Sequence, residues 1–472
     1  MLIAVVLLPL IAAGLVFVLS GNRSRITVLV LTAVAHLGFV ISFWRKDPGA
    51  RFQGFLSMDA LGLLVLSIIS VLFAMVALYL TSYLKPATER SKRDFIGCLL
   101  VFLSAMTLVT VSRHLGPLWI GIEATTLAGV PLINFERTPQ SIEATWKYIM
   151  ICSVGIALAL LGTYFLAVSA VDVQTLLLDK LLSHAAQLSL PWLKISAIFL
   201  LIGYGTKMGL APMHTWLPDA HSQAPSPVSA LLSGALLNCA FLGVLRVGQV
   251  CHAAGQTQFF SSMLILLGII SLGIAYVFIW GQGDYKRMLA YSSVEHMGIL
   301  AIGIGLGATG IYGSMLHAVN NAFSKGFIFL VTGNLYRQYR SRRVNDVRGV
   351  LHSYPMTGVL LLAGFLAVSG VPPFGTFLSE LIILNAAVAG RHYAVAFFYI
   401  LFLSLIFMGM AGIILKMAQG LPPERALNQT YKESPGTTLP ILFLALIVVM
   451  LGFYVPPFLN EVLQKASGLL QG

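Results

Sequence analysis

Long apolar segments separated by short polar loops make up almost the whole chain. Fourteen of these segments are long enough to cross a bilayer, which takes about 20 residues per helix. They show no strand-like alternation, and backbone groups must be paired inside hydrocarbon, so each segment is predicted to be a helix. The pattern therefore predicts an all-α polytopic membrane protein. The segments cover residues 2–20, 26–44, 59–84, 95–112, 115–133, 146–170, 192–212, 227–250, 258–280, 287–308, 310–335, 355–388, 393–417 and 438–458.

Composition agrees with this pattern. Of the 472 residues, 58% are hydrophobic and only 10% are charged, whereas soluble globular proteins have about 25% charged residues. A soluble chain and a disordered chain are therefore both excluded. In a membrane protein the net charge of +12 orients the spans and does not indicate nucleic-acid binding. The four cysteines form no C-x-x-C pair, so we expect no iron–sulfur cluster, no zinc site and no other cofactor.

Lysine and arginine gather in the cytoplasmic loops of membrane proteins. Here the odd-numbered loops hold 18 of the 29 cations, and the even-numbered loops with the C-terminus hold nine. This excess predicts that both termini lie outside, in the periplasm of a bacterium. The first segment is expected to be retained as a span, because no small-residue cleavage motif ends it. The 18 are Arg23, Arg25, Lys85, Arg90, Lys92, Arg93, Arg137, Lys147, Lys286, Arg287, Arg337, Arg340, Arg342, Arg343, Arg348, Lys416, Arg425 and Lys432.

Two segments carry internal breaks. The seventh runs through GTKMGLAPMHTWLPDAH, in which Pro212 and Pro218 are six residues apart, and the twelfth contains the adjacent Pro372 and Pro373. Proline removes a helical hydrogen bond, and the freed carbonyls need protein or water as partners, so broken spans predict a hydrated interior. Because the breaks are five spans apart, we predict two inverted five-helix repeats, a signature of transport folds. Two unrelated proline kinks are the alternative.

This interpretation divides the chain into four parts. Three N-terminal helices would occupy residues 1–94, the two repeats residues 95–250 and 258–417, and a loop with the last helix residues 418–472.

Single charges near the ends of spans have simpler roles. Asp59 opens the third span and is expected to cap it. Arg246, near the end of the eighth span, is expected to snorkel to the interface or else to end a relay. His214, Asp219 and His221 flank the first break, where polar capping is a commoner role than metal binding.

Titratable residues also lie inside five spans, where a charge costs at least about 2.5–3.5 kcal/mol. For any one of them, a salt bridge joining two helices is the alternative explanation. Acids, lysines and histidines together, spread over five spans, favour a proton relay, because these groups exchange protons. The candidate residues are Glu123, Lys207, Glu295, His296, His317, Lys325 and Glu380.

One span carries a polar stripe. His317, Asn321 and Lys325 are four residues apart, which places them on one helical face over roughly 12 Å of rise. Such a stripe inside an apolar helix is suited to line a chain of water molecules.

Five sequence blocks together resemble a known family. The chain is similar, over the fourth to the thirteenth span, to the antiporter-like membrane subunits of respiratory complex I, group 4 hydrogenases and Mrp-type sodium/proton antiporters. Within that group, APSPVSALLSGALLN and SSVEHMGI look most like component F of the hydrogenase-4 and formate hydrogenlyase type. The blocks are WIGIEATTLAGVPL, GYGTKMGLAPMHTWLPDAHSQAPSPVSALLSG, DYKRMLAYSSVEHMGI, HAVNNAFSKGFIFLVTG and SGVPPFGTFLSE.

The resemblance implies a fold of fourteen spans with two inverted repeats, and it implies roles by matching position. Glu123 and Lys207 match the charged pair of the first half-channel, Lys325 the central lysine, and Glu380 the acid of the second half-channel. His296 and His317 match positions on the central hydrophilic axis.

This chain also departs from the family pattern. It has Asn238 where relatives often carry Lys or His, and Asn321 where they often carry His. Asparagine takes no proton, so water or His317 would have to bridge Lys207 and Lys325. The sequence ends at Gly472, and we expect no long lateral helix of the kind found in the distal complex I subunit.

The leading hypothesis is a proton-translocating subunit of a complex I-like redox complex, of hydrogenase-4 or formate hydrogenlyase type, with no redox centre of its own. The alternatives are a subunit of a cation/proton antiporter, a membrane subunit of an NADH-quinone oxidoreductase, and a purely structural anchor. The expected partners are other membrane subunits, the lipid bilayer, and protons or Na⁺.

Overall fold

The computed structural model describes residues 1–84, 89–423 and 433–471. Within these ranges the chain is helical, and its only extended pairings are isolated bridges between loops. The predicted all-α fold class is therefore confirmed. The helices are α1 (Leu2–Val18), α2 (Asn22–Arg45), α3 (Ala60–Tyr83), α4 (Glu89–Val111), α5 (Leu115–Ile133), α6 (Pro139–Ser169), α7 (Leu178–Ser183), α8 (Leu190–Met208), α9 (Trp216–Gln223), α10 (Ser226–Leu231), α11 (Leu237–Ala253), α12 (Thr257–Ile279), α13 (Tyr285–Gly305), α14 (Ala308–Tyr339), α15 (Val350–Ser353), α16 (Pro355–Val368), α17 (Gly375–Ala389), α18 (Tyr393–Ala418), α20 (Pro435–Phe453) and α21 (Pro457–Gly468).

Shorter helical turns complete the described chain. Three are 3₁₀ turns, and one is a π-helical turn that joins α10 to α11. They cover Phe52–Gly54, Ala185–Gln187, Val344–Asp346 and, for the π turn, Leu232–Leu236.

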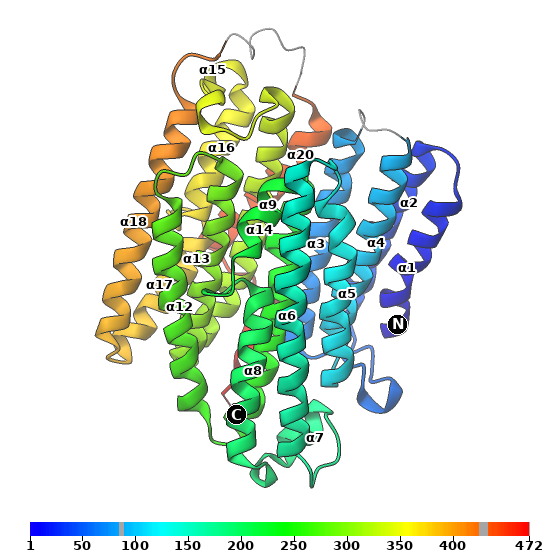
Figure 1. Ribbon diagram of the computed structural model, residues 1–472, viewed down its shortest axis with the longest axis vertical. Coiled ribbons are helices and arrows are strands. Elements are labelled where there is room, and N and C mark those ends of the chain that lie inside the picture. Colours follow the sequence, from blue (N-terminus) through cyan, green and yellow to red (C-terminus); the bar gives the residue numbers. More distant parts are fainter. Residues whose placement is uncertain (85–88, 424–432, 472) are drawn as a thin grey trace.

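The long helices run roughly along the longest dimension of the molecule (Figure 1). Helix α18 forms one flank, and α1 and α2 form the other. Both termini lie in the lower half of the view, the half that contains α7, whereas α15 lies at the opposite end. Of the cations counted for orientation, Lys85, Arg425 and Lys432 lie outside the described residues.

Each expected span coincides with a helix or with a pair of helices separated by a break. Among the described residues, 10 helices are long and apolar enough to cross a membrane, with α10, the π turn and α11 counted together. Helices α1, α16 and α17 are apolar but shorter. Helices α8 and α14 are long enough but less apolar, because they contain the buried lysines and their polar neighbours.

The first break lies between α8 and α9. Helix α8 ends at Met208 because Gly209 adopts φ +85°, a left-handed conformation that glycine takes without strain. Helix α9 then begins at Trp216. Pro218 was expected to lie in the break, and this is wrong. It lies in the first turn of α9, where a helix tolerates proline because the amide has no helical partner.

The second break separates α16 from α17 between Val368 and Gly375. It contains Pro372 and Pro373, as expected, together with Gly370 at φ +60°. Both breaks thus fall in the segments that the sequence indicates, while the division into two inverted repeats stays a prediction.

Helix α14 lies at the centre of the bundle, where it packs against α3, α13, α16, α17 and α20. Its residues from Gly313 to Leu335 are all buried. Close approach of other helices depends on small residues, as is usual in membranes. A Cβ on Gly203 of α8 would lie 2.5 Å from the carbonyl oxygen of Gly155 on α6. The missing side chain of Gly203 therefore lets α8 approach α6 closely.

Charged residues from even-numbered loops meet at one end of the bundle. Asp59 caps α3 by accepting a hydrogen bond from the Gly62 amide at 2.9 Å, as predicted. Its carboxylate also accepts from Arg113 at 2.7 Å and from both terminal nitrogens of Arg246 at 2.5 and 2.7 Å. Arg246 is 1% exposed, so the expectation that it snorkels to the interface is wrong. The buried carboxylate of Asp59 holds it inward.

The electrostatics of Asp59 follow from these contacts. Burial alone would raise the pKa of this carboxyl. The Arg246 and Arg113 guanidinium groups and the Gly62 amide outweigh burial and lower the pKa to about 2. The group therefore stays ionised and acts as a permanent anion that joins three segments of the chain.

Residues from odd-numbered loops and from α9 meet in separate ion pairs. Asp219 on α9 pairs with Lys147 at 2.9 Å and with Arg287 at 3.3 Å. Arg342 pairs with Glu136 at 2.9 Å. Odd-loop and even-loop residues therefore form separate clusters, the arrangement that alternate crossing of the membrane requires.

Candidate functional site

The first cluster of buried polar groups joins α5, α6 and α8. Lys207 is fully buried, and its Nζ donates to the hydroxyls of Thr126 and Tyr148, both at 2.9 Å. The Thr126 hydroxyl donates in turn to Glu123 Oε2 at 3.1 Å. Glu123 and Lys207, which were expected to form a pair, are thus linked through one hydroxyl rather than by direct contact.

Aromatic rings complete the surroundings of Lys207. Its Nζ lies 4.6 Å from the ring centre of Tyr148 and 5.8 Å from that of Trp216. The face of an aromatic ring attracts a cation, so both rings favour the ammonium form. Trp216 is the first residue of α9, and its indole N–H donates to the Thr206 carbonyl at 2.8 Å. The break between α8 and α9 therefore places this ring beside the lysine.

The second cluster lies between α13 and α14 and has a similar layout. Lys325 is fully buried, and its Nζ donates to the Ser292 hydroxyl at 2.6 Å and to the Leu289 carbonyl at 3.2 Å. The carboxyl group of Glu295, three residues later on the same helix, lies beside the Ser292 hydroxyl. A carboxyl group, a hydroxyl and a lysine thus follow one another here as they do around Lys207.

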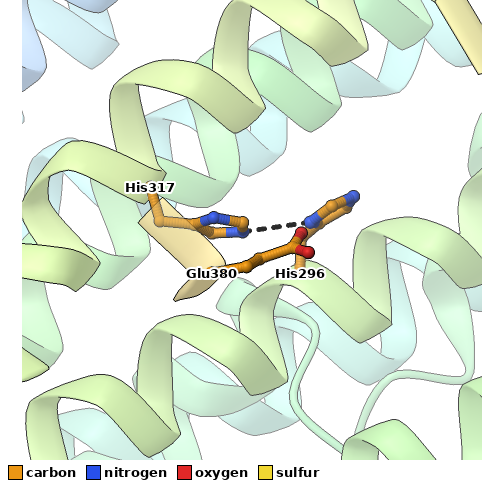
Figure 2. A group of neighbouring side chains, drawn as sticks. All are labelled: His296, His317 and Glu380. Atoms are coloured by element: carbon orange, nitrogen blue, oxygen red, sulfur yellow. Dashed lines mark hydrogen bonds between the residues drawn. The ribbon is translucent and has the colours of Figure 1, made fainter. Parts of the chain in front are cut away.

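The third cluster contains two histidines and an acid (Figure 2). His296 Nδ1 and His317 Nε2 are 3.0 Å apart and share a hydrogen bond. His317 Nδ1 lies 2.9 Å from the Ser379 hydroxyl. Glu380 of α17, which is 9% exposed, points toward the two rings. These residues come from α13, α14 and α17, so the second break helps to bring them together.

Several other buried polar atoms have no hydrogen-bond partner among the described residues. They include Oδ1 of Asn238, both side-chain polar atoms of Asn321, the Ser324 hydroxyl and both ring nitrogens of His221. Buried polar groups of this kind ordinarily bind water. Asn238 comes two residues after the end of the π-helical turn and donates to the Gly234 carbonyl within it at 2.8 Å. Turns of this kind occur often at functional sites.

The structure therefore brings the seven predicted residues into three clusters. Glu123 and Lys207 share the first, Glu295 and Lys325 the second, and His296, His317 and Glu380 the third. Sequence reasoning missed the hydroxyl groups that join them, those of Thr126, Tyr148, Ser292 and Ser379. The only signal was the spacing of three residues between each hydroxyl on α5 or α13 and the acid on the same helix. Serine and threonine are common in membrane helices, so this spacing alone indicates little.

The sequence of the chain is similar to those of known membrane proteins. A family model described as "NADH:quinone oxidoreductase/Mrp antiporter, TM" matches residues 112–406. A hydrogenase-4 component F homolog of Methylacidiphilum infernorum is 34% identical over 490 aligned positions, which cover 99% of each chain. NADH-quinone oxidoreductase subunit N of Desulforudis audaxviator is 30% identical over 445 positions, or 91% of this chain and 87% of that one.

The fold is also similar to a solved structure. A chain of the membrane-bound sulfane sulfur reductase, an archaeal respiratory membrane complex, superposes with a TM-score of 0.89. The match covers 100% of this chain and 97% of that chain at 20% sequence identity.

Proposed function

Because the chain belongs to the family of NADH:quinone oxidoreductase and Mrp antiporter membrane subunits, we propose that it carries protons across the membrane for a redox complex of the hydrogenase-4 type. Family membership makes it an antiporter-like, polytopic membrane subunit. The relative that is 34% identical over its full length supports the hydrogenase-4 type. The partners in this proposal are the other membrane subunits and the subunits that carry the redox centres.

One observation carries the proposal. In two separate clusters a carboxyl group contacts a hydroxyl, and that hydroxyl contacts a fully buried lysine. A salt bridge that only held helices together would be stronger with direct contact between its charges. A hydroxyl between acid and lysine separates the charges while it accepts one proton and donates another. This arrangement suits proton transfer better than structural support.

The proposed path runs along the middle of the membrane. Glu123 and Lys207 exchange a proton through Thr126, and water on Asn238 and Asn321 connects Lys207 to Lys325. Beyond Lys325, the Ser292 hydroxyl leads to Glu295, and the neighbouring histidines lead to Glu380. In this scheme the asparagines hold water and take no proton themselves.

The remaining parts of the proposal concern placement. We place the chain in the inner membrane of a bacterial cell with both termini in the periplasm, which the excess of cations in odd-numbered loops supports. The proposed repeats are residues 95–250 and 258–417, each of which contains one broken span.

Two further functions have specific support. Subunit N of an NADH-quinone oxidoreductase is 30% identical to this chain, which favours a quinone-linked complex as the second candidate. The family description also includes Mrp antiporters, in which case a cation gradient rather than electron transfer would accompany proton movement.

The proposal is tested by replacing Lys207 in the whole complex. Lys207→Ala should abolish redox-driven acidification of inside-out vesicles while assembly stays intact. The matched control is Lys194→Ala on the same helix, because Lys194 contacts the ring of Phe259 and lies outside the three clusters. An assembled Lys207→Ala complex that pumps as fast as the control would refute the relay.

The same vesicles distinguish the alternatives. Acidification that requires an electron donor supports a redox complex. Acidification that follows an imposed Na⁺ gradient without a donor supports the antiporter.

A further inference from the structure

Three possible metal ligands converge at the third cluster. His296, His317 and Glu380 each offer one ligand atom, and these atoms lie within 4.8 Å of one another. The three side chains come from α13, α14 and α17 and point toward a common centre (Figure 2). No other group of His, Cys, Asp or Glu in the described part of the chain has this spacing.

The spacing suits a zinc-type cation. Zinc binds histidine nitrogen and carboxylate oxygen at about 2.0–2.2 Å in tetrahedral geometry, so neighbouring ligand atoms lie about 3.3 Å apart. His296 Nδ1 and His317 Nε2 are already 3.0 Å apart. A shift of about 1.5 Å or less of the Glu380 carboxylate, at the end of a flexible side chain, would complete three ligands. Water would supply the fourth.

The tautomer of His317 also favours metal binding. The Ser379 hydroxyl donates its proton to a backbone carbonyl, with Thr376 the nearest at 2.9 Å. With the Ser379 proton on that carbonyl, His317 Nδ1 donates to the Ser379 oxygen, and the lone pair of Nε2 is directed at His296 and the cluster centre. Metal-binding histidines are usually fixed in this way by a second hydrogen bond.

His296 can adopt the matching tautomer. In the metal-free cluster its Nδ1 donates to His317 Nε2. Its Nε2 has no hydrogen-bond partner among the described residues. Transfer of the ring proton from Nδ1 to Nε2 therefore breaks one hydrogen bond and turns the Nδ1 lone pair toward the metal position.

Carboxyl groups and a cavity lie beside the three ligands. Glu380 and the nearby Glu295 place two carboxyl groups in this region, together with the Lys325 ammonium group. A cavity of about 420 Å³ reaches Glu380 between α17 and α18, and apolar side chains such as Phe377 and Leu381 form most of its wall. The break before α17 contributes Ser369, Gly370 and Val371 to this wall.

We propose that His296, His317 and Glu380 bind one divalent transition-metal cation of the zinc class. The bound metal would coordinate the lone pairs of the two histidine nitrogens and of the Glu380 carboxylate. These atoms could then accept no proton, so proton transfer would stop. The inhibition rests on the proposed function, whereas metal binding does not.

The binding experiment uses the purified complex after treatment with a chelator. Co²⁺ replaces Zn²⁺ as a coloured probe, and tetrahedral Co²⁺ should give strong visible absorption. His296→Gln and His317→Gln should each remove one bound equivalent and the absorption. The matched control is His36→Gln, because His36 is also buried but bonds only to Ser70 and Thr107. Ser379→Ala should weaken binding about tenfold or more through the orientation of His317.

A second measurement needs no variant. X-ray absorption of the Zn²⁺-loaded wild-type complex should show scattering from two imidazole rings. A spectrum without imidazole, or equal Co²⁺ absorption in wild type and both histidine variants, would overturn the proposed site.

Measuring proton pumping in the presence of Zn²⁺ distinguishes the proposed metal site from the proposed function. Zn²⁺ should stop redox-driven acidification at the concentration that fills the site, and a chelator should restore it. Zinc binding in a complex that does not pump would reject the proposed function and retain the site. Pumping that continues with the site filled would reject the inhibition.

Discussion

Replacement of Thr126 by valine tests the hydroxyl link most directly. Valine has nearly the same shape as threonine but no hydroxyl, so packing on α5 changes little. The variant loses the hydrogen bond from Lys207 at 2.9 Å and the bond to Glu123 at 3.1 Å. Lys207 keeps its bond to the Tyr148 hydroxyl, so the lysine remains in place while its connection to the acid is cut.

The expected magnitude follows from these two bonds. A hydrogen bond to a charged group contributes about 1.5–3 kcal/mol. If the transition state for proton transfer loses one such bond, worth about 1.5 kcal/mol, the rate of transfer falls about tenfold. If it loses both bonds, each worth about 1.5 kcal/mol, the rate falls about 150-fold. We therefore expect redox-driven acidification to fall by one to two orders of magnitude.

The assay measures acidification per electron-transfer turnover in inside-out vesicles. Thr126→Ser keeps the hydroxyl and should retain most of the activity. The control is Thr125→Val, because the Thr125 hydroxyl bonds only to the Ile122 carbonyl of its own helix. If Thr126→Val pumps at the rate of Thr125→Val, the hydroxyl is no part of the path and the reasoning from this geometry is wrong.

The remaining predictions concern three charged residues and the chain end. Lys325→Arg should block pumping as severely as alanine, because a guanidinium group does not release its proton in proteins; wild-type pumping would make Lys325 structural. Glu380→Asp keeps a titratable acid and should retain partial pumping, whereas Glu380→Gln should not; equal rates for the two would contradict a proton-carrying role. The pKa of Asp59, about 2, lies below its ordinary value of 3.8, so its stabilisation is present above about pH 4 and disappears as the pH falls toward 2. Asp59→Asn should therefore lower the stability of the purified complex by about 2 kcal/mol at neutral pH, and thermal unfolding from pH 7 to pH 3 should show a smaller loss for the variant than for wild type. A reporter fused after Gly472 should be active only in its periplasmic form; a cytoplasmic signal would contradict the orientation.

Much of the fold could be predicted from the sequence because the bilayer imposes simple rules. Long apolar runs must be helices, and the segments with Pro212 and with Pro372 must break. The exact position of the first break was less predictable. Gly209, rather than Pro218, decides where α8 ends, and a glycine becomes a helix stop only when its neighbours permit the left-handed conformation.

The candidate site was predicted only in part. The charged residues were visible because each is costly in hydrocarbon and stands out in an apolar run. The hydroxyls of Thr126 and Ser292 were not, because a hydroxyl in a helix can also bond to its own backbone, as that of Thr125 does. Arg246 shows the same limit. Its partner Asp59 lies 187 residues earlier in the chain, and no local pattern could connect them.

The distance along the chain between Asp59 and its partners has a consequence for how the protein is made. Synthesis proceeds from the N-terminus, so Asp59 emerges first, Arg113 follows 54 residues later and Arg246 follows 187 residues later. The carboxylate can thus acquire one guanidinium early and the second only when α11, which contains Arg246, is being made. Gln249 extends this connection, since it bonds both to Arg246 and to the carbonyl of Leu469 beyond α21. This end of the bundle therefore completes its contacts only after Leu469 has been made.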